Sequence, residues 1–158
     1  GVVLGVLAPN GSIDMPKMHQ LADKAHSLNL GMTFHRAIDQ CTDYQVALEQ
    51  VIALGCERIL TSGIAANAEQ GIHVLADMVK QADGRIDIMA GAGVNATNAK
   101  MIRSNTQVPA LHLSGKSTRP SLMEKSSSAQ MGNDNVDDYQ IPVTDARKIS
   151  DMRAVLAI

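Results

Sequence analysis

The 158-residue sequence contains no tryptophan, one phenylalanine and two tyrosines. With so few aromatic side chains, the core must be filled by aliphatic residues and by methionine, of which there are nine. Cys41 and Cys56 are the only cysteines, too few for a disulfide framework in a chain of this size. We therefore expect a reducing, cytoplasmic environment.

Long apolar runs and runs of one charge are also lacking. The longest apolar stretches fall well short of the roughly 20 residues that span a bilayer, so we expect no membrane partner. The formal net charge is −2, and no basic run is present to neutralise successive phosphates, which argues against nucleic acid as a partner. With 45% hydrophobic and 19% charged residues, the composition predicts a single globular domain over residues 1–158.

Five short apolar runs alternate with helical patterns along the chain. The runs are Val2–Leu7, Met32–His35, Arg58–Thr61, Ile86–Ala90 and Ala110–Leu113. They recur about every 28 residues, the length of a strand-loop-helix-loop unit, and they are continuously apolar, as parallel strands covered on both faces are. Two α/β architectures fit five such units: part of a (β/α)8 TIM barrel, or an open, doubly wound five-stranded sheet. The sequence starts inside a strand pattern, "GVVLGVL", which favours a partial barrel with three further units upstream.

Helix signals separate these runs, with one exception. Asp14 and Asp43 stand where they can cap helices that begin at the following residues. Residues 144–158 form an amphipathic pattern that predicts a closing helix. The exception is the stretch between the last predicted strand and this closing helix. Residues 114–143 are rich in Ser, Lys, Asn and Asp, and we expect a long polar loop there.

Polar residues gather where the predicted strands end, which is the ligand-binding end of both architectures. In "TFHRAID", alternation places Thr33 and His35 opposite Phe34, and the same argument on "LHLS" turns His112 and Ser114 inward. The candidate catalytic cluster comprises His35, Arg36, Asp39 and His112. The alternative is that the histidines are ordinary interior residues and that Arg36 and Asp39 form a local ion pair.

Glycine-bearing turns follow two other strands. They are "TSG" (Thr61, Ser62, Gly63) and "GAG" (Gly91, Ala92, Gly93), and "SGKS" with Ser114 follows the last strand. Glycine lets backbone N–H groups approach an oxyanion, so these turns are candidates for binding phosphate or another small ligand. Tight turns need glycine in any case, and the motif matches neither a Walker loop nor a dinucleotide fingerprint.

Soft metal ligands are sparse. Met15, Met18 and His19 could share one helix face, a set that suits Cu(I), and Cys41 is the fourth candidate. The alternative is that the methionines fill the core, since neither a CxxC motif nor a His-x-x-x-His pair occurs.

Five stretches of the sequence, taken together and in this order, resemble the CutC family of copper homeostasis proteins. They are "GVVLGVLAPNGSIDMPKM", "TFHRAID", "RILTSG", "AEQGIHVL" and "IMAGAGV". The resemblance implies a cytoplasmic (β/α)8 barrel, often a homo-oligomer, that is linked to copper tolerance and described as copper-binding. The residues that stand in matching motifs are Asp14, His35, Arg36, Asp39, Thr61, Ser62, Gly63, Gly91 and Gly93.

Two functions follow from these considerations. The resemblance favours a role in copper homeostasis, with copper as a ligand. The polar strand ends favour instead a barrel enzyme that acts on a small metabolite, with a phosphorylated one as a candidate. The residues alone leave open whether the protein is an enzyme.

Overall fold

The structure, a computed structural model, describes residues 1–124 and 137–156. It divides into two compact units, Gly1–Leu113 and Ser114–Ile158, where the sequence predicted one domain. The reason lies in the distribution of apolar residues. Among the described residues, every fully enclosed apolar side chain except Met152 belongs to the first unit.

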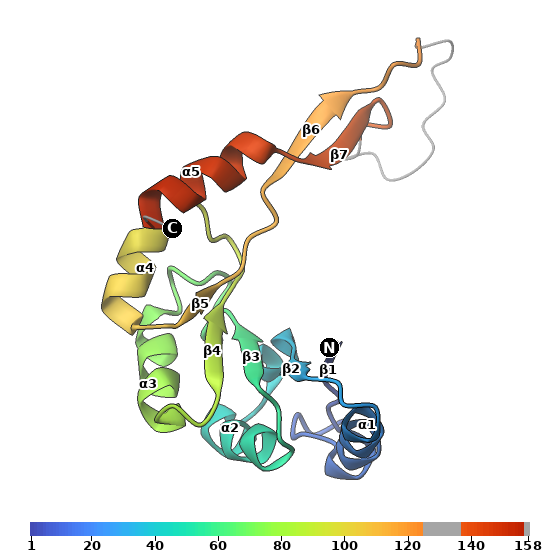
Figure 1. Cartoon of the computed structure of the whole chain (residues 1–158), viewed down its shortest axis with the longest axis vertical. Helices are drawn as coiled ribbons and strands as arrows, with labels where there is room; N and C mark the ends of the chain where they lie inside the picture. The colour runs from blue at the N-terminus through green and yellow to red at the C-terminus, as the bar shows by residue number, and fades with distance from the viewer. Residues whose placement is uncertain (125–136, 157–158) are drawn as a thin grey trace. The chain divides into compact units, whose positions relative to one another are not determined.

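The first unit is built on a parallel five-stranded sheet (Figure 1). Its strands are β1 (Val2–Leu4), β2 (Met32–Phe34), β3 (Arg58–Thr61), β4 (Asp87–Ala90) and β5 (Ala110–Leu111). Their order in the sheet is the order of the chain, so each strand pairs with the next one. A doubly wound sheet reverses its order at a switch point, whereas a barrel does not. The fold is therefore a partial TIM barrel, and the open doubly wound alternative is wrong.

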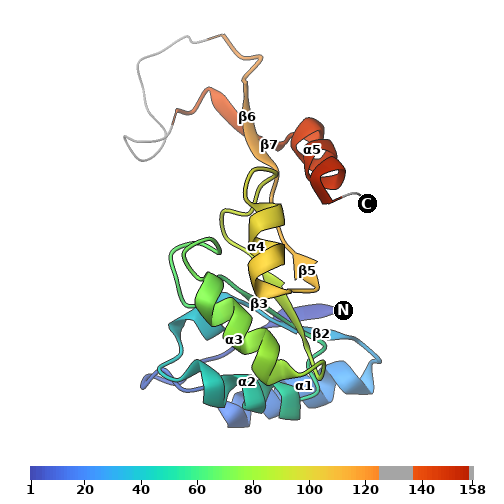
Figure 2. The same ribbon diagram turned by 90° about the vertical axis from the view of Figure 1, so that its left-hand side faces the viewer.

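Helices α1 to α4 lie along one side of this sheet (Figures 1 and 2). They are α1 (Met15–Ser27), α2 (Tyr44–Ala53), α3 (Ile72–Ala82) and α4 (Ala99–Thr106), with a short 3-10 helix, η1 (Arg36–Gln40), after β2. As predicted, Asp14 caps α1 by accepting the Lys17 N–H, and Asp43 caps α2 by accepting from Gln45 and Val46.

The core of the first unit lies between the sheet and these helices. Met32 and Phe34 of β2 are fully enclosed, as is Met18 of α1. Each such side chain contributes about 1.5–3 kcal/mol by leaving water. Phe34, the single phenylalanine, is among the fully buried residues, together with Met18, Met32 and Met78 and a larger number of aliphatic side chains.

The opposite side of the sheet, here called the inner face, carries the alternate residues. Val3, Thr33, Arg58 and Asp87 are neighbours in register across β1 to β4. Because successive side chains of a strand point to opposite sides, Thr33 faces away from Met32 and Phe34, as the sequence predicted. This alternation fixes which side chains the core encloses.

The second unit contains an antiparallel pair, β6 (Lys116–Pro120) and β7 (Gln140–Thr144), followed by α5 (Ala146–Leu156). The prediction of a polar loop over 114–143 is therefore wrong at both of its ends, and residues 125–136 lie outside the described residues. In the pair, Ser117 faces Val143 and Arg119 faces Ile141. Pairs of a polar and a β-branched residue are suitable for exposed strands. Such strands lack the continuous apolar run by which a buried strand is predicted from the sequence.

Candidate functional site

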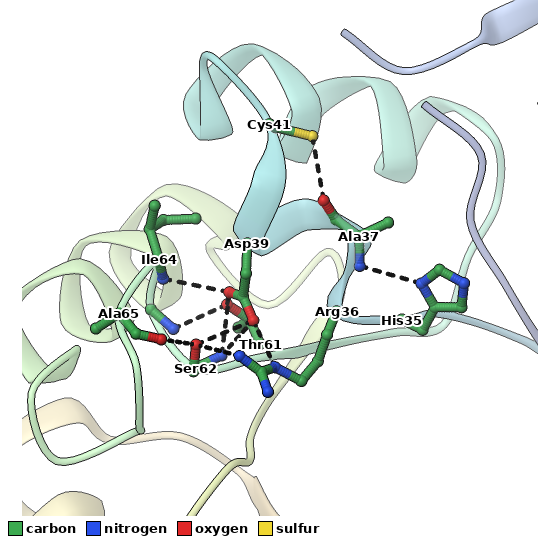
Figure 3. A network of polar contacts seen from close by, with 10 residues as sticks. His35, Arg36, Ala37, Asp39, Cys41, Thr61, Ser62, Ile64 and Ala65 are labelled. Carbon is green, nitrogen blue, oxygen red and sulfur yellow. Dashed lines mark hydrogen bonds and ion pairs between the residues drawn. The ribbon is translucent and has the colours of Figure 1, made fainter. Parts of the chain in front are cut away.

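The turns that follow β1 to β4, together with His112 after β5, are here called the carboxyl rim. At its centre lies the carboxylate of Asp39, which η1 presents to the turn after β3 (Figure 3). Although Asp39 is charged, only 3% of its side chain is exposed. A buried carboxylate requires hydrogen-bond donors on its oxygens, and this one has six contacts from four residues.

Both oxygens of Asp39 are occupied. Oδ1 accepts from the Thr61 hydroxyl (2.6 Å), from the Ile64 N–H (3.2 Å) and from the Ser62 N–H (3.1 Å). Oδ2 accepts from Arg36 Nε (2.7 Å) and shares the Ser62 N–H (3.1 Å). The cluster of Arg36, Asp39, Thr61, Ser62 and Ile64, here called the Asp39 network, joins two turns that lie far apart in the sequence.

The Ser62 hydroxyl links this network to the rest of its turn. Its oxygen lies 2.6 Å from the Ala65 carbonyl and 3.0 Å from Asp39 Oδ2, and it accepts from Arg36 Nη2 at 3.0 Å. A hydroxyl carries one hydrogen, so it donates to a single acceptor at a time, and the shorter contact is the one to Ala65. Ser62 therefore fixes the guanidinium and the turn together.

The pKa of Asp39 shows which influence dominates. Burial raises the pKa of this carboxyl, but the hydrogen bonds from Thr61, Arg36, Ser62 and Ile64 outweigh it, so the pKa lies below its ordinary value of 3.8. Asp39 is thus a stable anion that holds the turn. This role differs from that of a general acid or base, which needs a pKa near the working pH.

The turn after β3 offers no N–H group to a ligand at Ser62, Gly63 or Ile64. The N–H groups of Ser62 and Ile64 bind Asp39, and the Gly63 N–H donates to Thr61 Oγ1 at 2.9 Å. The oxyanion for which "TSG" is arranged is the chain's own carboxylate. That Thr61, Ser62 and Gly63 bind an external ligand stays a prediction, and the N–H groups of Ser62, Gly63 and Ile64 already have partners within the chain.

Gly63 is needed in this turn for two reasons. Its φ of +74° is a conformation that side chains disfavour, and a Cβ there would overlap the Gly71 carbonyl oxygen. Ile64 also has a positive φ, +58°, although it is β-branched. The hydrogen bond from its N–H to Asp39 helps to hold this unfavourable backbone in place.

The turn after β4 packs on the turn after β3. The Ala68 N–H donates to the Ala92 carbonyl at 3.0 Å, and the Gly91 N–H donates to the Thr61 carbonyl at 2.9 Å. Gly93 has a φ of +74°, and its carbonyl accepts from Asn98 Nδ2 at 3.1 Å. Gly93 is needed for its positive φ, and a Cβ at Gly91 would lie 2.6 Å from Leu60 Cδ1, so each glycine of this turn has a structural reason.

The two histidines of the candidate cluster do not meet. His35 follows β2 and its ring lies against Gly5, whereas His112 follows β5 beside Gly91. Two strands separate them, and the strand spacing puts β2 and β5 about 14 Å apart. His35 Nδ1 accepts the Ala37 N–H at 3.1 Å, which requires the tautomer with its hydrogen on Nε2. Figure 3 shows the His35 ring turned away from the Asp39 network.

Arg36 has the one polar side chain of the Asp39 network that is largely exposed. Its side chain is 44% exposed, while Asp39 and Ser62 fix its Nε and Nη2. A guanidinium has five N–H donors, so three remain for water or a ligand. Its orientation is set before any ligand arrives, which is the property that a binding residue requires.

Two further candidates for ligand binding have other partners. Asp14 accepts the backbone N–H of Lys17 and forms an ion pair with its Nζ at 2.6 Å, so it serves as the cap of α1. Ser114 belongs to the second unit, where its hydroxyl oxygen accepts the Lys116 N–H at 3.3 Å.

The candidate metal ligands differ in burial and in their surroundings. Met18 is fully enclosed in the core, and His19, its neighbour, is exposed with Nδ1 2.9 Å from the carbonyl of Met15. Burial, and then the Asp39 charge, raise the pKa of the Cys41 thiol, which disfavours the thiolate that binds metals. Throughout residues 1–124 and 137–156, no group of three or more His, Cys, Asp or Glu side chains could hold a metal ion.

Sequence reasoning missed two residues of this site, Ile64 and Gly71. Ile64 contributes a backbone N–H, and Gly71 contributes the absence of a side chain opposite Gly63. Neither contribution depends on a side chain, so the residue types at positions 64 and 71 give no sign of it.

Comparisons with known proteins agree on one family. A sequence model of the CutC family matches residues 1–117. The CutC family protein of Vibrio atlanticus (strain LGP32) is 79% identical over 156 residues, which are 99% of this chain and 63% of that protein. The CutC family protein of Aliivibrio fischeri (strain MJ11) is 60% identical over 150 residues, 94% of this chain and 61% of that protein.

A solved structure is similar as well. The crystal structure of the putative copper homeostasis protein CutC from Streptococcus agalactiae is 34% identical, with a TM-score of 0.64. The likeness covers 70% of this chain and 53% of that one. The chain thus spans less than two thirds of the length of these relatives.

Proposed function

Because this chain belongs to the CutC family, we propose that it takes part in copper homeostasis, the role that the name of the solved Streptococcus agalactiae relative gives for that protein. The family match carries this proposal. We also propose a cytoplasmic location, which the free thiols of Cys41 and Cys56 support. No helix of the described ranges is both long enough and apolar enough to cross a bilayer.

Among the residues that the structure describes, the candidate ligands do not fit a copper centre. Cu(I) prefers two or more thiolate, thioether or imidazole ligands that converge on one point. Met18 lies in the core and His19 outside it, and the Cys41 thiol lies 3.8 Å from the Ala37 carbonyl in η1. Direct copper binding by this chain therefore stays a prediction that rests on the family resemblance alone.

A titration tests whether Met15, Met18 or Cys41 binds copper. Cu(I) is titrated against a competing chelator with the unchanged chain and with the Met15→Leu, Met18→Leu and Cys41→Ser variants. Because these side chains do not converge, we expect that no single substitution changes the Cu(I) affinity by more than about twofold. A loss of tenfold or more in any variant would establish that residue as a ligand and contradict this interpretation.

A second candidate function is the binding of a small anionic metabolite at the carboxyl rim. The observation that favours it is the exposed guanidinium of Arg36, which Asp39 and Ser62 hold in one orientation at the end of the sheet where barrels bind ligands. Arginine recognises carboxylate and phosphate groups through paired N–H donors. Whether chemistry follows binding depends on the ligand, and a barrel enzyme stays the alternative to a binding protein.

Arg36→Gln is the variant that tests the rim. In a screen of small metabolites, we expect anionic ligands that bind the unchanged chain to lose about 10- to 100-fold in affinity, since a charged hydrogen bond is removed. Arg103→Gln, which removes an exposed arginine of α4, is the matched control and should leave the affinity unchanged. Circular dichroism verifies that both variants fold. If the hits bind Arg36→Gln as tightly as the unchanged chain, the rim is not their site.

A further inference from the structure

The turn after β4 differs from the turn after β3 in its backbone N–H groups. In the turn after β3, the N–H groups of residues 62–64 are all bound within the chain. In the turn after β4, those of Ala92 and Gly93 have no acceptor within residues 1–124 and 137–156. Both residues have a positive φ, +73° and +74°. Successive N–H groups in such a turn form a concavity that is suited to an anion.

The backbone of Ala92 is also unfavourable for a residue that is not glycine. Among the described residues, five residues other than glycine have a positive φ. Three of them follow helices, where this conformation commonly ends the helix: Asn29, Asp83 and Gln107. The other two, Ile64 and Ala92, lie in neighbouring turns of the carboxyl rim. Unfavourable backbone conformations gather at ligand-binding sites, and the one at Ala92 has no hydrogen bond of its N–H to hold it.

Two polar side chains flank this turn. The register of β3, β4 and β5, continued by one residue, places Ser62, Gly91 and His112 side by side at the strand ends. Ser62 holds Arg36 Nη2 at 3.0 Å, and a Cβ at Gly91 would lie 3.7 Å from His112 Cδ2. Arg36 and His112 therefore stand on either side of Gly91, over two strand spacings, which are about 10 Å. An anion above Gly91 can be reached from both sides.

These donors match a phosphate group better than a carboxylate. A carboxylate has two oxygens, and the paired N–H donors of Arg36 alone can satisfy both. The N–H groups of the turn after β4 and the ring of His112 would then have no acceptor on the ligand. A phosphate monoester carries three terminal oxygens and a charge between about −1.5 and −2 at neutral pH, so each of the three groups can receive an oxygen.

We propose that Arg36, the N–H groups of Ala92 and Gly93, and the His112 ring bind the phosphate group of a small phosphorylated metabolite. This inference rests on the proposal that the carboxyl rim binds anionic metabolites, and it names their chemical class. All three groups come from neighbouring strand ends of the first unit, at β3, β4 and β5. His112 thus has a role that does not require it to meet His35.

Three small anions with different numbers of free oxygens provide the test. Methyl phosphate presents three terminal oxygens, whereas dimethyl phosphate and acetate present two each. In NMR titrations at constant ionic strength, we expect the chain to bind methyl phosphate about tenfold or more tightly than either of the others. Equal affinities for methyl phosphate and acetate, both lost in Arg36→Gln, would overturn the phosphate assignment alone. If Arg36→Gln changes none of the affinities, the rim is not an anion site either.

His112→Phe removes the N–H donor of the ring and keeps most of its volume. We expect the affinity for methyl phosphate to fall about tenfold and the affinity for acetate to stay the same, since acetate needs Arg36 alone. His112→Gln keeps an N–H donor and should lose less. His73→Phe, at an exposed position of α3, is the matched control, and circular dichroism verifies that the variants fold. An unchanged affinity for methyl phosphate in His112→Phe would remove His112 from the site.

The amide signals of Ala92 and Gly93 report on the backbone part of the site. In proton–nitrogen correlation spectra, we expect methyl phosphate to shift both signals as it saturates the chain, because their N–H groups gain an acceptor. Gly84 is the internal control, since it has a similar φ of +72° but precedes β4, at the opposite end of the strand. Signals of Ala92 and Gly93 that move no more than that of Gly84 would contradict the role of this turn.

Discussion

Replacing Asp39 by alanine is expected to lower the free energy of unfolding by about 3–5 kcal/mol, because Arg36 Nε and the buried donors of the turn after β3 lose their acceptor. Chemical denaturation monitored by circular dichroism measures this loss. Asp39→Asn, which keeps the shape and removes the charge, should also destabilise, since its amide nitrogen would face donors. A stability within 1 kcal/mol of the unchanged chain for both variants would contradict the role of the network.

Added formate distinguishes loss of an anion from loss of packing. In Asp39→Ala, the N–H groups of Ser62 and Ile64 still converge on the vacated position, so a small carboxylate can bind there. We expect formate, at constant ionic strength with chloride as control, to raise the melting temperature of this variant and not that of the unchanged chain. Equal shifts in both proteins would show that the salt acts elsewhere.

The difference in stability between the unchanged chain and Asp39→Ala should depend on pH, because the pKa of Asp39 is lowered. A carboxylate with a depressed pKa in the folded state adds stability above its unfolded-state pKa, and this contribution is lost as the pH falls through the folded-state value. The gap between the unchanged chain and Asp39→Ala should therefore be full at neutral pH and narrow below pH 3.8. Glu49, whose pKa Arg85 lowers to about 2, titrates in both proteins and cancels in the difference.

Gly63→Ala is expected to cost about 2–5 kcal/mol of stability. One part is the positive φ of Gly63, about 1–2 kcal/mol for a residue with a Cβ. The other is the overlap of that Cβ with the backbone of Gly71, typically about 1–3 kcal/mol where the neighbours must shift. The contact is between two backbones, so no side-chain rotation relieves it.

Substitutions at two other glycines measure the steric contribution and the backbone contribution to this stability loss separately. Gly71→Ala has an ordinary φ of −87° but a Cβ that would overlap the Ser62 carbonyl oxygen, so it reports the steric part alone. Gly84→Ala has a φ of +72° with nothing within 4 Å of its Cβ, so it reports the backbone part alone. Denaturant unfolding of the three variants should rank Gly84→Ala as the mildest. If Gly84→Ala is as harmful as Gly63→Ala, the contact with Gly71 has no energetic role.

The sequence predicted the sheet well because its strands are continuously apolar and evenly spaced. Four of the five strands lie within a residue or two of the predicted bounds, and the first is shorter, ending at Leu4 before Gly5. The CutC family, inferred from the motifs, is confirmed by the family match and the relatives. The pair β6 and β7 was missed because exposed strands with mixed side chains lack an apolar pattern.

The candidate site was harder to predict, for a geometric reason. Arg36 and Asp39 are three residues apart, so their ion pair could be anticipated locally, whereas Thr61 and Ser62 reach Asp39 only through the packing of β3 beside β2. Alternation along a strand correctly placed Thr33 on the inner face. It gave no information on how many strands separate His35 from His112, which decides whether two side chains can meet.

The Asp39 network also has a kinetic consequence. Amide hydrogens of a surface turn commonly exchange with solvent deuterium within the dead time of the measurement, because the turn opens independently of the sheet. Here the amides of Ser62, Gly63 and Ile64 are held by buried oxygens of Asp39 and Thr61. Their exchange therefore requires the turn to leave the carboxylate, and in a deuterium-labelling experiment this connection would behave as a continuation of β3.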